Sequence, residues 1–146
     1  MKVNLGGNTI IDCAAALVIN GSEVFRLRQR ESDGRLICDF DIHGKDDGRI
    51  AKIAKNNIVY AAEGYRVHNL PRESYVQGPD GSPVARVREV ANDEIAITGV
   101  FWVKGHQVVI TETSLVSGGI TMSGNVIKGF GKAISINPGS FSIGAA

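Results

Sequence analysis

The same phrase occurs near both ends of this chain, and it restricts the fold more than any other feature. Residues 7–20 read GNTIIDCAAALVIN, and residues 124–137 read GNVIKGFGKAISIN, 117 positions later. When residues 3–20 are aligned with residues 120–137, six of the eighteen positions are identical, and several others exchange one apolar residue for another. Because equivalent apolar positions indicate a shared inward face, we expect the two segments to stack on each other.

The second segment carries the alternation Gly-Asn-x-Ile followed by Ala-Ile-x-Ile-Asn. This pattern resembles the coils of right-handed parallel β-helix proteins of the pectate-lyase type. In such coils, apolar residues stack inward and an Asn at a turn hydrogen-bonds the Asn of the next coil. The resemblance implies that the two chain ends lie side by side, with Asn8 over Asn125.

The enzymes of that family bring acidic residues and Arg or Lys into a groove that runs along many coils. Two coils cannot form such a groove, and Asp12 is the only carboxylate within either repeat. The resemblance therefore implies no activity for this chain.

Between the two phrases, apolar and polar residues alternate with a period of two, which is typical of strands. Asp-Gly pairs at 33–34, 47–48 and 80–81 favour hairpin turns. We interpret residues 49–56, RIAKIAKN, as a strand, although Ile50, Ile53 and Ala54 also fit helical spacing. The other expected strands are 24–30, 35–42, 57–60, 65–68, 73–76, 83–90, 94–103 and 107–113.

This pattern predicts an all-β fold in a single domain, residues 1–146. Residues 21–117 are expected to form an antiparallel meander, either a barrel or a curled sheet. Two β-helix-like terminal coil segments, 1–20 and 118–141, are expected to flank the meander and pack together.

One hairpin can be predicted residue by residue. If Asp33-Gly34 forms a two-residue loop, the apolar pairs Phe25–Ile42 and Leu27–Phe40 share one face of the hairpin. The charged pairs Arg26–Asp41 and Arg28–Asp39 share the other face, as a half-solvated sheet requires.

Composition excludes several classes of function. Sixteen Lys and Arg balance fifteen Asp and Glu, so the sequence predicts no nucleic-acid partner. No apolar run approaches the roughly 18 residues of a membrane span, and no signal-peptide core follows the N-terminus. Cys13 and Cys38 are too few for a disulfide framework, so we expect both to be reduced and buried, in a cytoplasmic protein.

The best candidate for chemistry is the sequence Asp39-x-Asp41-x-His43. On a strand these three side chains share a face, where they could offer a divalent metal two carboxylates and an imidazole, or supply general acid and base groups. A solvated ladder of charges, with Arg26 and Arg28 as the partners of the aspartates, explains the same pattern without a ligand. We favour the ladder and expect no bound metal.

Trp102 is the candidate for ligand binding. It follows Phe101 on one expected strand, so one of the two rings must face outward or into a pocket. A Trp at the mouth of a barrel can stack on a sugar or a small apolar ligand. Core packing, without a ligand, is the simpler interpretation.

The sequence carries no Walker loop, no Rossmann fingerprint and no Gly-x-Ser-x-Gly or His-Glu-x-x-His motif, so we expect no cofactor. We therefore expect a non-enzymatic assembly or binding module that self-associates through its coil segments, because two repeat units are fewer than a stable stack needs. The alternatives are a small hydrolase or lyase, with or without a metal, that uses Asp39, Asp41 and His43, and a ligand-binding barrel around Trp102.

Overall fold

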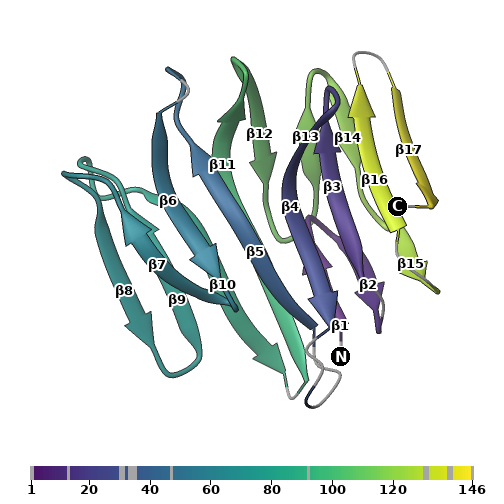
Figure 1. Cartoon of the computed structure of the whole chain (residues 1–146), viewed down its shortest axis with the longest axis horizontal. Coiled ribbons are helices and arrows are strands. Elements are labelled where there is room, and N and C mark those ends of the chain that lie inside the picture. Colours follow the sequence, from purple (N-terminus) through teal and green to yellow (C-terminus); the bar gives the residue numbers. More distant parts are fainter. Residues whose placement is uncertain are drawn as a thin grey trace.

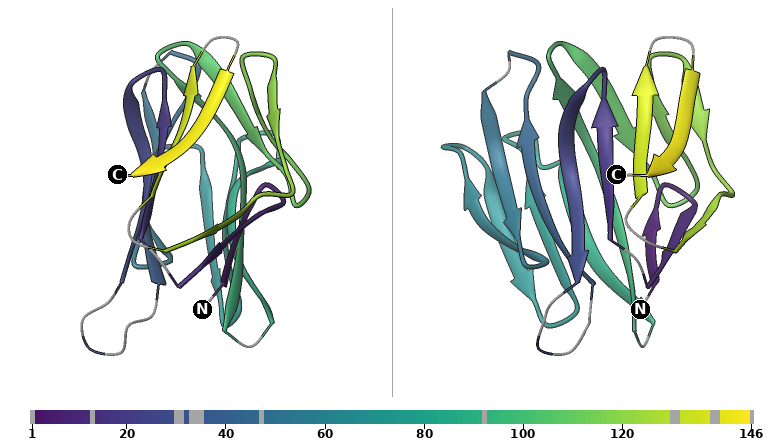
Figure 2. Two further views of the ribbon diagram at one scale, coloured as in Figure 1. Left: turned by 90° about the vertical axis from the view of Figure 1, so that its right-hand side faces the viewer. Right: turned by 45° about the vertical axis from the view of Figure 1, so that its right-hand side comes forward.

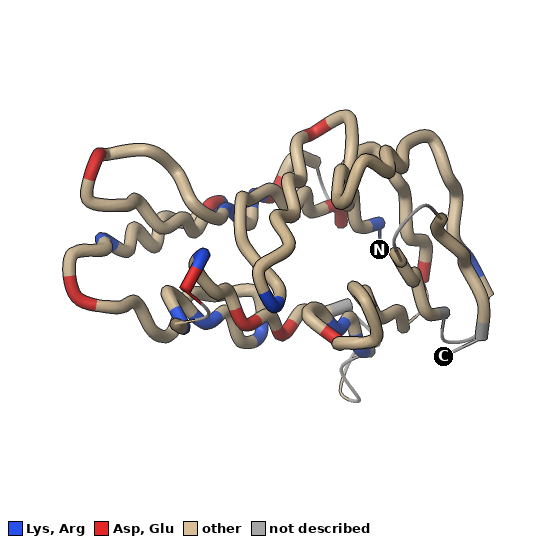
Figure 3. The backbone as a smooth tube through the Cα atoms, turned by 90° about the horizontal axis from the view of Figure 1, so that it is seen from above, with Lys and Arg blue, Asp and Glu red and all other residues tan. Residues whose placement is uncertain are grey.

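The computed structural model describes residues 2–12, 14–29, 32, 36–46, 48–91, 93–129, 132–137 and 140–145. All regular structure in these residues is β-strand, in two sheets that lie one above the other (Figure 1 and Figure 3). Within the same residues there is no helix, and so none that is long and apolar enough to cross a membrane. The predicted all-β class is confirmed.

One layer is a seven-stranded sheet with the order β17-β16-β3-β4-β5-β6-β7. Its strands are β3 (Ala15–Ile19), β4 (Ser22–Gln29), β5 (Leu36–His43), β6 (Arg49–Ala54), β7 (Asn57–Ala61), β16 (Lys132–Asn137) and β17 (Ser140–Ala145). Strand β6 confirms the strand that was predicted within residues 49–56.

The other layer is a ten-stranded sheet that branches at β11 (Glu94–Val103). β11 pairs with β10 over residues 94–99, in parallel with β1 over 94–97, and with β12 over 99–103. Since a strand has two hydrogen-bonding edges, β1 and β12 share the edge opposite β10. The other strands are β1 (Lys2–Leu5), β2 (Asn8–Ile11), β8 (Arg66–Leu70), β9 (Glu73–Gln77), β10 (Pro83–Ala91), β12 (His106–Ile110), β13 (Leu115–Ser117), β14 (Ile120–Met122) and β15 (Val126–Lys128).

The predicted meander is present, but it is folded into two layers. β3 to β7 pair in sequence as antiparallel neighbours in the seven-stranded sheet, and β8 to β14 do so in the ten-stranded sheet. Residues 62–65 carry the chain from one layer to the other. Among the described residues the strands form neither a closed barrel nor a β-helix, so these finer expectations are not met.

The two copies of the repeated phrase stack with the predicted offset. In parallel pairs, β15 lies against β2 with Ile127 opposite Ile10, and β16 lies against β3 with Ile134 opposite Leu17. Each copy thus contributes one strand to each sheet, and the two terminal segments lie side by side (Figure 2). The strands that precede the two phrases, β1 and β14, do not pair in equivalent ways. β1 pairs with β2 and β11, whereas β14 pairs with β13.

Aromatic side chains join the layers at the centre of the core. The ring of Phe40 packs edge-on against Phe25 of its own sheet at 5.6 Å and against Phe101 of the opposite sheet at 4.9 Å, centroid to centroid. Both geometries are favourable for aromatic pairs. All three rings are buried, so Phe101 is the ring of the Phe101–Trp102 pair that enters the core.

The residue-by-residue register of the β4–β5 hairpin was wrong by two positions. Phe25 lies opposite Phe40, and Leu27 lies opposite Cys38. The connection spans residues 30–35, and the predicted Asp33-Gly34 turn lies outside the described residues. A shift of two keeps every side chain on its predicted face, so the alternation that predicted the faces could not distinguish the two registers.

Candidate functional site

Asp39, Asp41 and His43 alternate along β5 with the buried residues Cys38 and Ile42. They therefore project from the outer face of the seven-stranded sheet, as predicted. In the pairing with β6, Ile42 lies opposite Ala51 and His43 lies opposite Arg49, so a β-bulge leaves Ile50 of β6 as the extra residue beside the third member of the motif.

The aspartates are engaged by cations. The carboxylate of Asp39 accepts a hydrogen bond from Nε of Arg28 at 2.7 Å, and Asp41 lies 3.9 Å from the guanidinium of Arg49. Arg28 and Asp39 thus form the predicted ion pair, but not as directly opposed residues, because Arg28 lies opposite Ile37 and Asp39 lies opposite Arg26. The predicted Arg26–Asp41 pair is wrong. Arg26 instead binds Glu23 at 2.7 Å, because the corrected register moves it away from Asp41.

This face has the character of a solvated charge ladder. The ion pairs with Arg28 and Arg49 hold both carboxylates toward guanidinium groups. In the described part of the chain, no three His, Cys, Asp or Glu side chains are grouped so that they could hold a metal ion. The ladder interpretation of the β5 face therefore has direct geometric support.

The structure brings Trp102 together with two of the β5 residues. Asp41, His43 and Trp102 line one pocket of about 200 Å³, which we call the Trp102 pocket. Val24 and Lys104 add an apolar and a cationic wall. Residues that the sequence presented as two separate candidates thus belong to one site that spans both sheets.

A second pocket, of about 440 Å³, adjoins the other side of Trp102. Its lining is more apolar and includes Tyr65, Pro79, Pro83 and Val84. Trp102 is half-buried and lines both pockets. A pair of pockets that share an aromatic wall can accept a small ligand with one apolar and one polar side.

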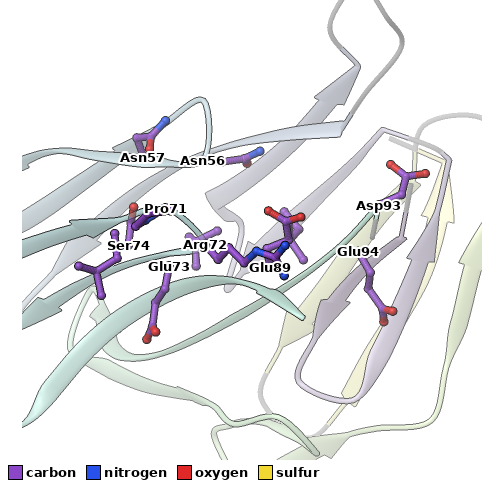
Figure 4. Close-up of a pocket in the computed structure, with 12 residues that line it drawn as sticks. Asn56, Asn57, Pro71, Arg72, Glu73, Ser74, Glu89, Asp93 and Glu94 are labelled. Carbon is purple, nitrogen blue, oxygen red and sulfur yellow. The ribbon is translucent and has the colours of Figure 1, made fainter. Parts of the chain in front are cut away.

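A third pocket lies where three hairpin turns meet, as Figure 4 shows. Asn56 comes from the β6–β7 turn and Asn57 from the start of β7, Arg72 from the β8–β9 turn, Glu89 from β10, and Asp93 from the β10–β11 connection. The pocket is small, about 160 Å³. The sequence did not predict it, because the pocket needs the β6–β7 turn of one sheet beside the β8–β9 turn and the β10–β11 connection of the other.

Backbone contacts hold this turn pocket in shape. The amide of Glu89 donates to the carbonyl of Arg72 at 2.8 Å, and Oδ1 of Asn56 accepts from the amide of Cys38 at 2.8 Å. Glu73, on its rim, is paired with Arg86 at 2.6 Å. The polar groups here serve the turns themselves, so the pocket is a structural junction.

Cys38 is a free, buried thiol, as predicted. Burial raises its pKa to about 12, and the negative charge of Asp39 acts in the same direction. The thiol is therefore protonated at neutral pH and unsuited to nucleophilic chemistry. Cys13 lies outside the described residues.

The end of the molecule that carries the stacked segments exposes apolar side chains on edge strands. β17 is the last strand of the seven-stranded sheet, and Phe141 and Ile143 on it are 42% and 38% exposed. β15 is the corresponding edge of the ten-stranded sheet, where Val126 is 61% exposed. We refer to β17 and its unpaired side as the β17 edge.

Comparison of the chain with models of known protein families, with curated protein sequences and with solved structures returned no match.

Proposed function

We propose that this protein is a non-enzymatic assembly module that self-associates through the end of the molecule formed by its stacked terminal segments. The observation that carries the proposal is the β17 edge. An edge strand presents unpaired N–H and C=O groups that another chain can pair with. Proteins that remain monomeric usually protect such edges with charged residues, proline, bulges or short strands.

The β17 edge has none of the charge protection. Residues 140–145 read SFSIGA, with no Lys, Arg, Asp or Glu. The strand is six residues long and pairs with β16 without a register shift, so no bulge interrupts it. Its apolar residues remain partly in water in a single chain, and covering them would release that water favourably.

The other edges of the molecule are better protected. β15 has only three residues and ends at Lys128. β7, at the far end of the seven-stranded sheet, exposes Val59 and Tyr60, but a β-bulge at Val59 interrupts its pairing with β6. The cations Arg49 and Lys52 of β6 also lie beside Tyr60. β8 begins with Arg66. These differences favour the β17 edge as the surface of association.

Light scattering of the purified protein over a range of concentrations tests the proposal. We expect a mass of at least two chains, and a return to one chain in the double variant Phe141→Lys, Ile143→Lys. The matched control places the same charges at the opposite end, in Val59→Lys, Val67→Lys, and should leave the mass unchanged. A single-chain mass for the unaltered protein at every concentration would refute self-association.

A second candidate function is the binding of a small ligand at Trp102. The observation that favours it is the meeting of Asp41, His43 and Trp102 in one pocket beside an apolar one. A saccharide offers the matching combination of an apolar ring face and hydroxyl groups at its edges. Because Trp102 is the only tryptophan of the chain, its fluorescence reports on this site alone. A titration with cellobiose or maltose should shift the emission, and no change with either sugar would count against this function.

The hydrolase or lyase alternative has weaker support. Both carboxylates of the β5 face are paired with Arg side chains, so a charge ladder accounts for them without an active site. We therefore retain Asp39, Asp41 and His43 as structural and pocket-lining residues in the proposal.

A further inference from the structure

We propose that the partner at the β17 edge is a second copy of this chain, bound about a twofold axis with the two β17 strands antiparallel and Ser142 opposite the partner's Ser142. This inference rests on the proposed self-association and specifies its geometry. It extends the seven-stranded sheet of one molecule directly into that of the next.

The orientation of the β17 side chains is fixed by β16. Ile143 lies opposite Ile134, and Phe141 lies opposite Ile136. Both β16 isoleucines are buried in the core. Directly opposed residues of an antiparallel pair point to the same face, so Phe141 and Ile143 continue the inner apolar face of the sheet beyond its last covered strand.

Side-chain direction restricts the register of a twofold pair. In such a pair the numbers of opposed residues add up to a constant. An odd constant would place Phe141 opposite a serine or glycine of the outer face, so that the inner faces of the two sheets would not be continuous. Only an even constant joins the apolar faces.

Among the even registers, one places the exposed Phe141 and Ile143 of each strand opposite the Ile143 and Phe141 of the other. With Ser142 on the axis, Phe141 lies opposite the partner's Ile143, and Ile143 lies opposite the partner's Phe141. Centring the axis on Phe141 would leave Ile143 without an opposed residue in the strand. Centring it on Ile143 would place Phe141 opposite the partner's Ala145, so that no aromatic–aliphatic pair with Ile143 would form. Cross-strand pairs of aromatic and β-branched residues are among the stabilising ones.

The outer face of the strand permits the same arrangement. A twofold axis brings identical groups together, so a charged residue on the axis would repel its own copy. Ser142 is small and uncharged, and Ser140 would meet the partner's Gly144. Both serines and Gly144 are exposed in the single chain, and a Cβ at Gly144 would touch no other atom within 4 Å.

A closed twofold pair also agrees with the difference between the β17 edge and the β7 edge of the seven-stranded sheet. If β17 instead paired with the partner's β7, the contact would join unlike surfaces and would propagate into an open-ended oligomer. The cations and the bulge beside β7 disfavour that contact, whereas the β17 edge is complementary to itself.

Disulfide trapping tests this register. Directly opposed strand residues have Cα atoms about 4.5–5.5 Å apart, within the range that a disulfide spans. The background is the full chain with Cys13→Ser, which leaves the buried Cys38 as its only thiol. Under mild oxidation, Ser142→Cys should form a covalent dimer several-fold faster than Ser140→Cys, which lies on the same face. Ser140→Cys mixed with Gly144→Cys should give a cross-linked heterodimer, although neither variant alone does so efficiently.

The outcomes separate the inference from the proposed function. Equal cross-linking of Ser140→Cys and Ser142→Cys alone would overturn the register. A dimeric mass by light scattering without any cross-linking at these positions would overturn the β17 pairing, while self-association would stand. A ladder of higher oligomers would favour the open-ended contact with β7 and would overturn the twofold axis. A single-chain mass with no cross-linking would refute both.

Discussion

The side-chain amide of Asn125 donates a hydrogen bond to Oδ1 of Asn8 at 2.8 Å, which joins two residues that are 117 positions apart. The backbone amide of Asn125 donates to the same oxygen at 3.3 Å, and the amide of Thr9 donates to the carbonyl of Asn125 at 2.8 Å. The side-chain nitrogen of Asn8 donates in turn to the carbonyls of Leu5, at 2.9 Å, and Gly6, at 3.1 Å. One buried amide thus satisfies the turn of its own segment and holds the second segment in register.

We expect Asn8→Ala to lower the free energy of unfolding by about 2–3 kcal/mol, because the substitution leaves buried backbone groups without partners. Asn125→Ala should cost about 1 kcal/mol, since Asn125 is only half-buried and loses one strong contact. Urea unfolding of both single variants and the double variant measures the coupling. If the two losses were simply additive, the contact between the asparagines would contribute nothing to the stack.

The exposed pair Arg28–Asp39 should contribute little to stability. The two side chains are 44% and 36% exposed, and ion pairs of this kind contribute at most about 1 kcal/mol. Asp39→Asn and the control Asp41→Asn should therefore shift the unfolding midpoint only slightly. A loss of several kcal/mol for Asp39→Asn alone would indicate that the carboxylate is liganded, and would return the β5 face to consideration as a chemical site.

Two glycines with similar backbone conformations, Gly7 and Gly119, offer a matched test of close packing. Gly7 has φ +74°, and a Cβ there would lie 2.4 Å from the carbonyl oxygen of Thr113. Gly119 has a similar φ of +78°, but a Cβ there would meet nothing within 4 Å. Gly119→Ala should cost about 1–2 kcal/mol from the left-handed conformation alone. Gly7→Ala should cost a further 1–3 kcal/mol or so, because the 111–114 loop must move. Equal losses in thermal unfolding would show that this contact is not tight.

Stability should fall at alkaline pH through Cys38. The pKa of its thiol is raised in the folded protein from 9.0 to about 12, so the folded state disfavours the thiolate. The contribution of the protonated thiol is fully present below pH 9 and is lost as the pH rises toward 12. Between pH 8 and pH 10.5, Cys38 should lower the unfolding free energy by about 2 kcal/mol. The difference between the unaltered protein and Cys38→Ala in urea unfolding isolates this effect, and a pH-independent difference would contradict it.

Alternation predicted the strands β4 to β12 and the stacking of the two terminal segments, but not β13. The repeated phrase aligns Gly7, Asn8 and Ile10 with Gly124, Asn125 and Ile127. The parallel pairing of β15 with β2 has the same offset of 117 positions. Partition into two sheets could not be predicted, because residues 62–65 carry no signal that distinguishes a hairpin turn from a crossing between layers. The hairpin register failed for a similar reason, since an even shift leaves the pattern at Phe25 and Leu27 unchanged.

The candidate site was predicted in parts. Asp39, Asp41 and His43 could be placed on one face because a strand repeats every two residues. Their meeting with Trp102 depends on how β5 and β11 lie across the sandwich, and no local pattern encodes that distance. The β17 edge was visible only as an apolar C-terminal stretch, since exposure depends on which strand is last in the sheet.

Hydrogen–deuterium exchange at two protein concentrations tests the central claim most directly. At high concentration, we expect slow exchange of amides in β17 (Ser140–Ala145). On dilution, exchange in this segment alone should accelerate, while the amides of the central strands β4 and β5 remain protected. Protection of β17 that does not depend on concentration, or concentration-dependent protection at β7 and β8 instead, would contradict association through the β17 edge.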